Sequence, residues 1–214
     1  LLPAERAADC GAAEELEFLV LDFANAFQNI FVQKKERRFN VCQVGGRWFV
    51  FLVLLFGSVT SPGVWGRLAA WLGRTCSALV PVHRLRLQTY VDDPLVAVRG
   101  SRPTRSRLFA LVLAWLAVIG LPMSWGKGAC GRRVSWIGAS LDWRSDHTLL
   151  SVPAHRVAEF TTELISMAAK TVVPLKAVQS LAGKLNFYAG IVVHVRPFLQ
   201  MLWGAIAQVE SRER

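Results

Sequence analysis

The stretch LQTYVDDPLVAV, residues 87–98, places two adjacent aspartates, Asp92 and Asp93, between two apolar runs. Leucine and polar residues alternate before the pair, and a proline and an apolar run follow it, which is typical of a hairpin with acidic residues at its bend. Aspartate is a common turn residue, so a solvated bend is the simplest interpretation. Two like charges at one bend also repel each other, and a bound cation would relieve that repulsion. The rest of the chain decides between these two interpretations.

The composition indicates a folded, basic protein. The chain has 214 residues, of which 53% are hydrophobic, and this is enough for the core of one large domain or two small ones. Lys and Arg total 25 against 15 Asp and Glu, so the net charge is +10. Such an excess favours a polyanionic partner such as nucleic acid. The charge alone is equally compatible with a basic protein that has no such partner.

The cysteines and the first residues predict an intracellular location, in the cytoplasm or the nucleus. The cysteines are widely and irregularly spaced, without a CxxC motif, so we expect reduced thiols and neither a zinc site nor disulfides. The first 18 residues lack the basic start and apolar core of a signal peptide, and they begin without Met, which suggests a fragment. The four cysteines are Cys10, Cys42, Cys76 and Cys130.

Two apolar runs, residues 48–56 and 108–121, resemble short membrane spans. Both are shorter than the roughly 20 residues that a helical span needs. We therefore expect both runs to be core elements and the protein to have no stable membrane association. A membrane-associated protein, attached through residues 108–121, is an alternative that the short run opposes.

Hydrophobic periodicity predicts an α+β fold with a helical part after about residue 150. An apolar strand at residues 18–21 leads into Asp22, and Gly45-Gly46 is expected to form the two-residue turn of a hairpin. Gly138 falls inside a predicted strand, where glycine suggests close approach of another backbone. Two predicted helices cover residues 60–79 and 102–120. Three more are predicted to begin at Pro153, at Pro174 and at about residue 196.

The helix at residues 60–79 has a clear predicted start and face. Ser61 suits the N-cap, and Pro62 suits the first helical position. The expected buried face consists of Val64, Leu68, Trp71, Leu72 and Leu79.

Three aspartates are expected to meet at one edge of the predicted sheet. Asp22 ends a strand, while Asp92 and Asp93 lie at the bend of a hairpin. If both strands belong to one sheet, the cluster needs a cation to offset its mutual repulsion. Carboxylates together with phosphate oxygens are the usual ligands of Mg²⁺. Two such ions can stabilise both oxygens of an in-line phosphoryl displacement, so the residues predict two-metal nucleotidyl transfer.

Five segments, in this order along the chain, resemble the motifs of reverse transcriptases of retrotransposons, of the long-terminal-repeat or DIRS type. Together they extend over roughly residues 16–205. A four-residue pattern such as YVDD is weak evidence by itself, but five ordered matches are specific. The segments are LDFANAF (21–27), LLFGSVTSPGVW (54–65), YVDD (90–93), WGKGACGRRVSWIGASLDW (125–143) and LKAVQSLAGKLNFYAGIV (175–192).

The resemblance implies a polymerase palm over residues 1–150, a ferredoxin-like antiparallel sheet with packed helices and with the fingers largely missing. A helical thumb or connection segment would follow over residues 151–214. It also implies an RNA-directed DNA polymerase that transfers nucleotides to a primer with two Mg²⁺ ions, or with Mn²⁺. The implied partners are an RNA or DNA template with its primer and a deoxynucleoside triphosphate.

The same resemblance implies a role for individual residues. Asp22, Asp92 and Asp93 would bind the metal ions, and Lys127 would protonate the leaving pyrophosphate. Residue type alone favours a core position for Phe27, simple capping for Ser61 and Pro62, and solvation for Lys127. The implied nucleotide-binding residues are Phe27, Phe56 and Gly57, and the implied template- and primer-binding residues are Ser61, Pro62, Tyr90, Trp136 and Gly138.

A second hypothesis is a catalytically inactive relic of a retroelement polymerase that still binds nucleic acid. Its basis is the positive charge, which supports salt-dependent, largely sequence-independent binding. Any single basic cluster is more simply explained as a solvated face. The basic residues concerned are Lys34, Lys35, Arg37 and Arg38; Arg99, Arg102, Arg105 and Arg107; and Arg132 and Arg133.

Overall fold

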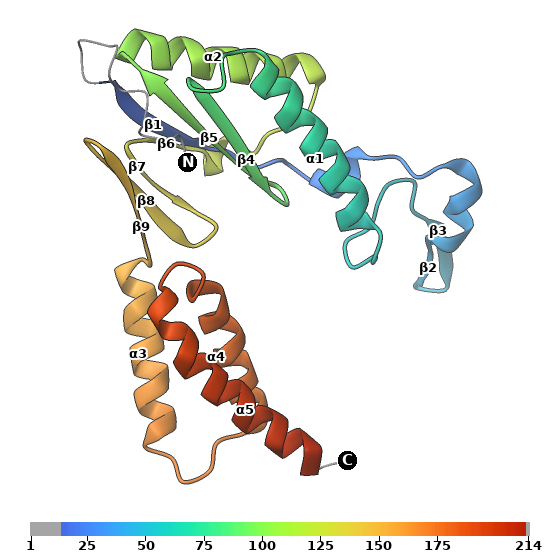
Figure 1. Ribbon diagram of the computed structural model, residues 1–214. Helices are drawn as coiled ribbons and strands as arrows, with labels where there is room; N and C mark the ends of the chain where they lie inside the picture. The colour runs from blue at the N-terminus through green and yellow to red at the C-terminus, as the bar shows by residue number, and fades with distance from the viewer. Residues whose placement is uncertain (1–13, 213–214) are drawn as a thin grey trace. The chain divides into compact units, whose positions relative to one another are not determined.

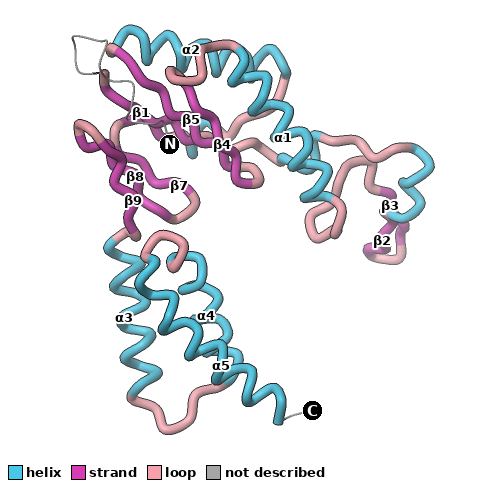
Figure 2. The backbone as a smooth tube through the Cα atoms, viewed as in Figure 1, coloured by secondary structure: helices cyan, strands magenta, loops and turns pink. Residues whose placement is uncertain are grey.

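The computed structural model describes residues 14–212, so Cys10 lies outside the described part. The chain divides into two compact units. One comprises the chain up to Ile137 together with Asp142–Thr148, and the other comprises Gly138–Leu141 together with Leu149–Arg214. The architecture is α+β, as the sequence predicts (Figures 1 and 2).

A four-stranded antiparallel sheet is the centre of the first unit. Its spatial order is β4-β5-β1-β6, and the elements follow the chain order β1, α1, β4, β5, α2, β6. This is the β-α-β-β-α-β order of a ferredoxin-like fold, which confirms the expected palm-type sheet. The bounds are β1 (Glu15–Val20), α1 (Ser61–Ala78), β4 (Leu85–Tyr90), β5 (Asp93–Gly100), α2 (Arg102–Ile119) and β6 (Ala129–Gly131).

Both long helices pack on the same face of this sheet (Figure 1). The register pairs Leu19 of β1 with Val96 of β5, and Val96 with Leu87 of β4, so these side chains point to one face. They join Trp65 of α1 and Val112 of α2 in the main hydrophobic core. The alternation of strand side chains therefore supplies the helix-facing side of the core.

The opposite face of β1 is also buried. Phe18 is fully buried, and Leu16 and Val20 are nearly so, although all three alternate with the residues that face the helices. Strand β7 (Arg133–Trp136), which contacts β1, contributes the buried Val134. Because β1 is central and buried on both faces, its sequence is almost continuously apolar towards its end.

The predicted glycine hairpin is confirmed. Strands β2 (Val41–Val44) and β3 (Arg47–Val50) flank Gly45 and Gly46, both of which have positive φ angles. Such angles match the primed turns that suit two-residue hairpins. The expectation that residues 48–56 are core is wrong for most of the run, because Trp48 is 70% exposed and Phe56 is 64% exposed, whereas Leu54 does pack against the main core. The two strands form a separate two-stranded sheet, and most of their residues are exposed.

Helix α1 forms where the sequence predicts it, but its start and its buried face differ. Thr60 is the N-cap, so Ser61 is the first helical residue and Pro62 the second, where a missing N–H costs little. Trp71, expected on the buried face, is 43% exposed. Trp65 is buried instead, together with the residues four positions before and after it, Ser61 and Ala69. Both sets have helical spacing and each contains a tryptophan, so spacing and residue type do not determine which face is buried. The buried residues are Ser61, Trp65, Ala69, Leu72 and Cys76.

Helix α2 ends as predicted, at Gly120. This residue adopts a left-handed conformation with φ of +76° and closes the helix through a hydrogen bond to Ala117. Phe109, Val112 and Leu116 face the core, so most of the apolar run at residues 108–121 is a packed helix. No helix within residues 14–212 is both long and apolar enough to cross a membrane.

The segment around Gly138 is a hairpin, and the prediction of one continuous strand there is wrong. Ile137 and Gly138 both have positive φ angles and form a two-residue turn between β7 and β8 (Ala139–Arg144). Strand β9 (His147–Ser151) completes a three-stranded sheet in the order β7-β8-β9. The alternation of apolar residues continues through such a turn, which is why periodicity alone did not show it.

The second unit is mainly helical. It contains α3 (Ala154–Ala168), α4 (Leu175–Tyr188) and α5 (Arg196–Arg212), and the predicted prolines Pro153 and Pro174 are the N-caps of the first two. Leu181 and Ala182 are the buried residues of α4, and Leu199 and Ile206 are buried on α5. Helix α3 has no fully buried residue, and its Ile165 is 65% exposed.

The burial of Cys76 predicts slow alkylation. The side chain is 1% exposed, and burial raises the pKa of its thiol to about 11 from an ordinary value of 9.0. At pH 8 the thiolate fraction is then lower by roughly a hundredfold than for an ordinary thiol, and the thiolate is the reactive form. Mass mapping after iodoacetamide treatment should show Cys42, which is only partly buried, modified long before Cys76. Equal rates under native conditions would contradict the described core.

Two glycine substitutions should change stability in opposite directions. Gly120→Ala forces a side chain into a left-handed conformation and should lower the free energy of unfolding by about 1 kcal/mol. Gly66→Ala lies inside α1 with open space around the added methyl group, and it should raise that free energy by about 0.5–1 kcal/mol. Urea denaturation measures both, and a stabilising Gly120→Ala would show that the helix does not end there.

Candidate functional site

Strand register brings the first aspartate to the bend that carries the other two. Val20, the last residue of β1, pairs with Leu95 near the start of β5. Beyond the strand, the Leu21 amide donates to the Pro94 carbonyl at 3.0 Å, and the Phe23 amide donates to the Asp92 carbonyl at 2.9 Å. Asp22 lies between these two bonds. The expected convergence of Asp22 with the acidic bend is therefore present at one edge of the sheet.

The bend is a two-residue turn made of Val91 and Asp92. Tyr90 pairs with Asp93, so the hairpin closes with these two residues between the strands. Val91 has φ of +53°, a left-handed conformation that β-branched residues rarely adopt. Backbone strain of this kind costs about 1–3 kcal/mol and persists only where the surrounding structure enforces it. The turn is thus held in place by contacts from outside its own sequence.

The carboxylates interact electrostatically. Burial raises the pKa of Asp93, and the nearby charges of Asp92 and Asp22 raise it further. Burial alone would also raise the pKa of Asp22, but hydrogen bonds from Ser124 and Lys127, with the lysine charge, hold it below its usual value. The edge of the sheet therefore carries a concentration of negative charge that one cation already offsets in part.

Lys127 is that cation. Its Nζ lies 2.9 Å from the Asp22 carboxylate, and this ion pair raises the pKa of the lysine. The residue belongs to the short helical turn η4 (Trp125–Lys127), and its side chain is 71% exposed. The backbone amide of Ser124, the residue before this turn, donates a hydrogen bond to the Asp22 carbonyl at 2.8 Å. The structure thus brings Lys127 to the three aspartates, although the sequence placed it far away.

The acidic edge suits a divalent cation that receives part of its shell from another molecule. Within residues 14–212 no three His, Cys, Asp or Glu side chains are arranged to hold an ion by themselves. Mg²⁺ is usually bound by one or two carboxylates, with water and substrate phosphate completing its octahedron. Asp22 and the Asp92–Asp93 pair fit that pattern. The ammonium group of Lys127 lies beside the Asp22 carboxylate, which shows that this edge stabilises a positive charge.

Phe27 and Phe56, two of the residues expected to bind nucleotide, lie together. Phe27 belongs to the short helix η2 (Ala26–Asn29), is 7% exposed, and meets the ring of Phe56 edge-on at 4.9 Å. Gly57 follows with φ of +85°, and a side chain there would meet open space. The glycine is therefore needed for its backbone conformation, whereas Phe27 is at once a core residue and a neighbour of the exposed Phe56.

The other expected contact residues lie at separate points of the fold. Pro62 is exposed on the first turn of α1, whereas Ser61 is buried, and its hydroxyl has no partner within the described structure. Tyr90 is 53% exposed at the end of β4. Trp136 is close to the aspartates, since its indole N–H donates to the Asp93 carbonyl at 3.0 Å. Gly138 lies in the second unit, where the Tyr188 hydroxyl donates to its carbonyl at 3.4 Å.

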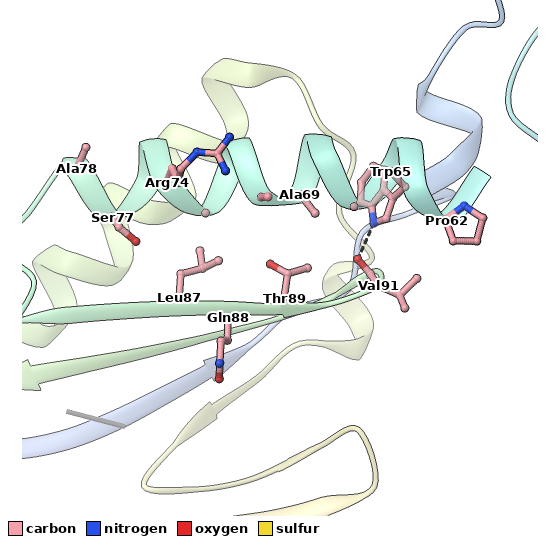
Figure 3. A pocket seen from close by; sticks show the side chains of 13 residues that line it. Pro62, Trp65, Ala69, Arg74, Ser77, Ala78, Leu87, Gln88, Thr89 and Val91 are labelled. Carbon is pink, nitrogen blue, oxygen red and sulfur yellow. Dashed lines mark hydrogen bonds between the residues drawn. The ribbon is translucent and has the colours of Figure 1, made fainter. Parts of the chain in front are cut away.

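A groove of about 770 Å³ runs between α1 and β4, with small residues such as Ala69 and Gly73 along the helix (Figure 3). Leu87 and Thr89 point from β4 towards α1, while Gln88 points to the other side of the strand. The groove reaches Val91 at the turn, but none of the three aspartates lines it. It is therefore a neighbour of the acidic edge and separate from it.

Several of the predicted basic residues are engaged in ion pairs. Arg105 is 6% exposed and binds Glu17 at 2.8 Å and Glu15 at 3.1 Å, which ties α2 to β1. Arg99 pairs with Glu14 at 3.5 Å. These two side chains help to hold the fold and are not free to bind phosphate. Arg132 and Arg133 likewise pair with Glu15 and Asp142, at 3.2 and 2.6 Å.

The motif resemblance gave two residues of this site no role, although Trp65 ends the matching segment at residues 54–65. Ser124 helps to lower the pKa of Asp22 as a hydrogen-bond donor, and Trp65 donates its indole N–H to the Val91 carbonyl at 2.5 Å. Figure 3 shows this bond between the first turns of α1 and the hairpin turn. The position of Trp65 was predicted to be helical, but the spacing assigned the buried face to other residues.

Comparison with known proteins gives the chain a family and a fold. Residues 8–141, more than half of the chain, match the family model described as reverse transcriptase (RNA-dependent DNA polymerase). No curated protein is similar enough in sequence to match the chain.

Two solved structures of a foamy viral protease-reverse transcriptase are similar in fold. The first, in complex with an RNA/DNA hybrid, has 18% identity and a TM-score of 0.62 over 90% of this chain. The second, a dRH form in complex with double-stranded DNA, has 18% identity and a TM-score of 0.64 over 90% of this chain. The present chain spans 24% and 31% of those two proteins. With the ferredoxin-like sheet and its acidic edge, the family match shows that the chain belongs to the reverse transcriptase family.

Proposed function

We propose that this chain is the polymerase palm and part of the thumb of a retroelement reverse transcriptase, and that it transfers deoxynucleotides to a primer. The observation that carries the proposal is the convergence of Asp22 with the Val91–Asp93 turn at one edge of a ferredoxin-like sheet. Residues 1–150 would form the palm and residues 151–214 the thumb or connection. The motif order supports an origin in a long-terminal-repeat or DIRS-type element.

The aspartates would bind two Mg²⁺ ions, with Mn²⁺ as a substitute. Asp22 and Asp92 would be the principal ligands, and Asp93 would support them. When bound, the ions would polarise the reacting phosphate and stabilise the attacking and leaving oxygens. Burial raises the pKa of Asp93 most, and the charges of Asp92 and Asp22 raise it further; this second contribution reflects the negative charge at the acidic edge and supports the assignment.

Lys127 would have two successive roles. In the free chain its ammonium group pairs with Asp22 and offsets the acidic edge. A cation at Asp22 would replace that contact, and the exposed side chain has the freedom to turn towards the leaving pyrophosphate. A lysine is protonated at neutral pH even without the Asp22 contact, so it would have a proton to donate.

Phe27 and Phe56 would form the nucleotide side of the site, together with the backbone at Gly57. Phe27 is fixed by burial and by its edge-on contact with Phe56, so its ring is a rigid wall. A rigid ring beneath the sugar would exclude a ribose 2′-hydroxyl. The partners would be an RNA or DNA template with its primer, near Ser61, Pro62, Tyr90, Trp136 and Gly138.

The free thiols of Cys42, Cys76 and Cys130 support an intracellular location.

Replacing Asp92 should remove primer extension. In Asp92→Asn the side chain keeps its size but loses its charge, and we expect the extension rate with Mg²⁺ to fall by at least about a hundredfold. Asp146→Asn is the matched control, because Asp146 is an exposed turn residue whose carboxylate pairs with the neighbouring His147. Unchanged extension by Asp92→Asn would refute the catalytic assignment. Salt-sensitive nucleic-acid binding without any extension in the unmodified chain would instead favour the inactive relic.

Shortening Phe27 should weaken the discrimination between sugars. In Phe27→Ala the proposed wall beneath the sugar is lost, so we expect the ratio of kcat/KM for deoxynucleotides over ribonucleotides to fall by about tenfold or more. Phe31→Ala is the control, since Phe31 is 75% exposed and lies outside this contact. Steady-state kinetics with the two nucleotide types measures the ratio. An unchanged ratio would leave Phe27 with a purely structural role.

A further inference from the structure

We propose that Trp65 is a positioning residue for the carboxylates, which holds the Val91–Asp93 turn through its indole N–H, with Trp136 as a second donor. The inference rests on the proposed function, because it concerns how the same aspartates are kept beside Asp22. It assigns a role to Trp65 of α1, which ends the matching segment at residues 54–65 but received no role from the resemblance.

Three successive carbonyls of the turn are each held by a different segment. The Val91 carbonyl accepts from Trp65 of α1 at 2.5 Å, and the Asp93 carbonyl accepts from Trp136 of β7 at 3.0 Å. Between them, the Asp92 carbonyl accepts from the Phe23 amide at 2.9 Å. Rotation of any of these peptide groups would break a hydrogen bond. The orientation of the aspartates is therefore determined by α1, by the segment after β1, and by β7.

The turn needs this support because its own sequence opposes its conformation. Two-residue hairpin turns favour glycine, asparagine or aspartate, whereas Val91 is β-branched and has a positive φ angle. Asp92 and Asp93 also repel each other and Asp22 when no cation is bound. A strained conformation of this kind persists only where its surroundings enforce it. The two indole donors are the side chains that hold the carbonyls on either side of Asp92.

Trp65 is itself fixed in place. It is completely buried, and its ring meets that of Phe23 edge-on at a centroid distance of 5.3 Å. Phe23 follows Asp22 directly, so one indole contacts the Asp22 segment with its ring and the Asp92 turn with its N–H. A phenylalanine at this position would fill most of the same space but could not donate the hydrogen bond. This separates the positioning role from simple packing.

Hydrogen exchange in the full chain tests the proposal without requiring activity. In Trp65→Phe, without metal, we expect the amides of Phe23 and of residues 89–93 and 95–96 to exchange about five- to tenfold faster, since one buried hydrogen bond is lost. The Mn²⁺ dissociation constant should rise by a similar factor, because binding must now also order the turn. Trp71→Phe is the matched control, on the same helix but 43% exposed, and it should change neither quantity.

The location of the change decides the outcome. Faster exchange confined to Phe23 and the turn supports the proposal, and an equal rise throughout α2 would show general destabilisation and overturn it. Unchanged exchange at the turn would also overturn it. If Trp65→Phe does not fold, the same measurement on Trp136→Phe, whose side chain is only partly buried, takes its place. If amide exchange rises at Phe23 and the turn in Trp65→Phe, but neither this variant nor the unmodified chain binds Mn²⁺, the positioning role would be supported and the proposed function refuted.

Discussion

Mutual repulsion among three carboxylates is the constraint on which the rest of the site depends. Asp22 and the Asp92–Asp93 pair come from segments about seventy residues apart, and the register of β1 against β5 brings them to one edge. A fold that concentrates charge in this way must resist the tendency of the edge to open. Backbone bonds on both sides of Asp22, the Lys127 ion pair and the two indole donors all act against that tendency.

The ferredoxin-like sheet supplies the rigidity for this arrangement. Central strand β1 is buried on both faces, and its end is bonded to the start of β5. Arg105 fastens α2 to β1 through Glu15 and Glu17 at the far end of the strand from Asp22. The ion pairs that hold the fold and the acidic edge that would bind cations therefore lie at opposite ends of β1. This separation lets a basic protein use part of its positive charge for structure.

The sequence predicted those parts of the fold that local chemistry determines. Gly45-Gly46, Gly120, Pro153 and Pro174 mark turns and helix ends because few residues tolerate those backbone conformations. The buried face of α1 could not be predicted, because two sets of residues, each with a tryptophan, had helical spacing, and only tertiary packing distinguishes them.

For the site, the motifs located the aspartates and Lys127 in sequence, but not the contacts that orient them. Those contacts come from backbone carbonyls and from side chains distant in sequence, Ser124, Trp65 and Trp136, and no local pattern encodes such pairings. The turn at Ile137–Gly138 escaped prediction for a related reason. Its residues continue the apolar alternation, so only the positive φ angles of the structure reveal the bend.

The ion pair between Lys127 and Asp22 has a consequence for biogenesis. Many small metal-binding domains stay unfolded until the metal arrives, because their ligands otherwise have no partner. Here Lys127 already serves as a counterion to Asp22, so folding of the acidic edge would not require a divalent ion. Maturation of the fold and loading of a metal would then be separate events, and a cation that enters later would exchange with a lysine in a finished scaffold.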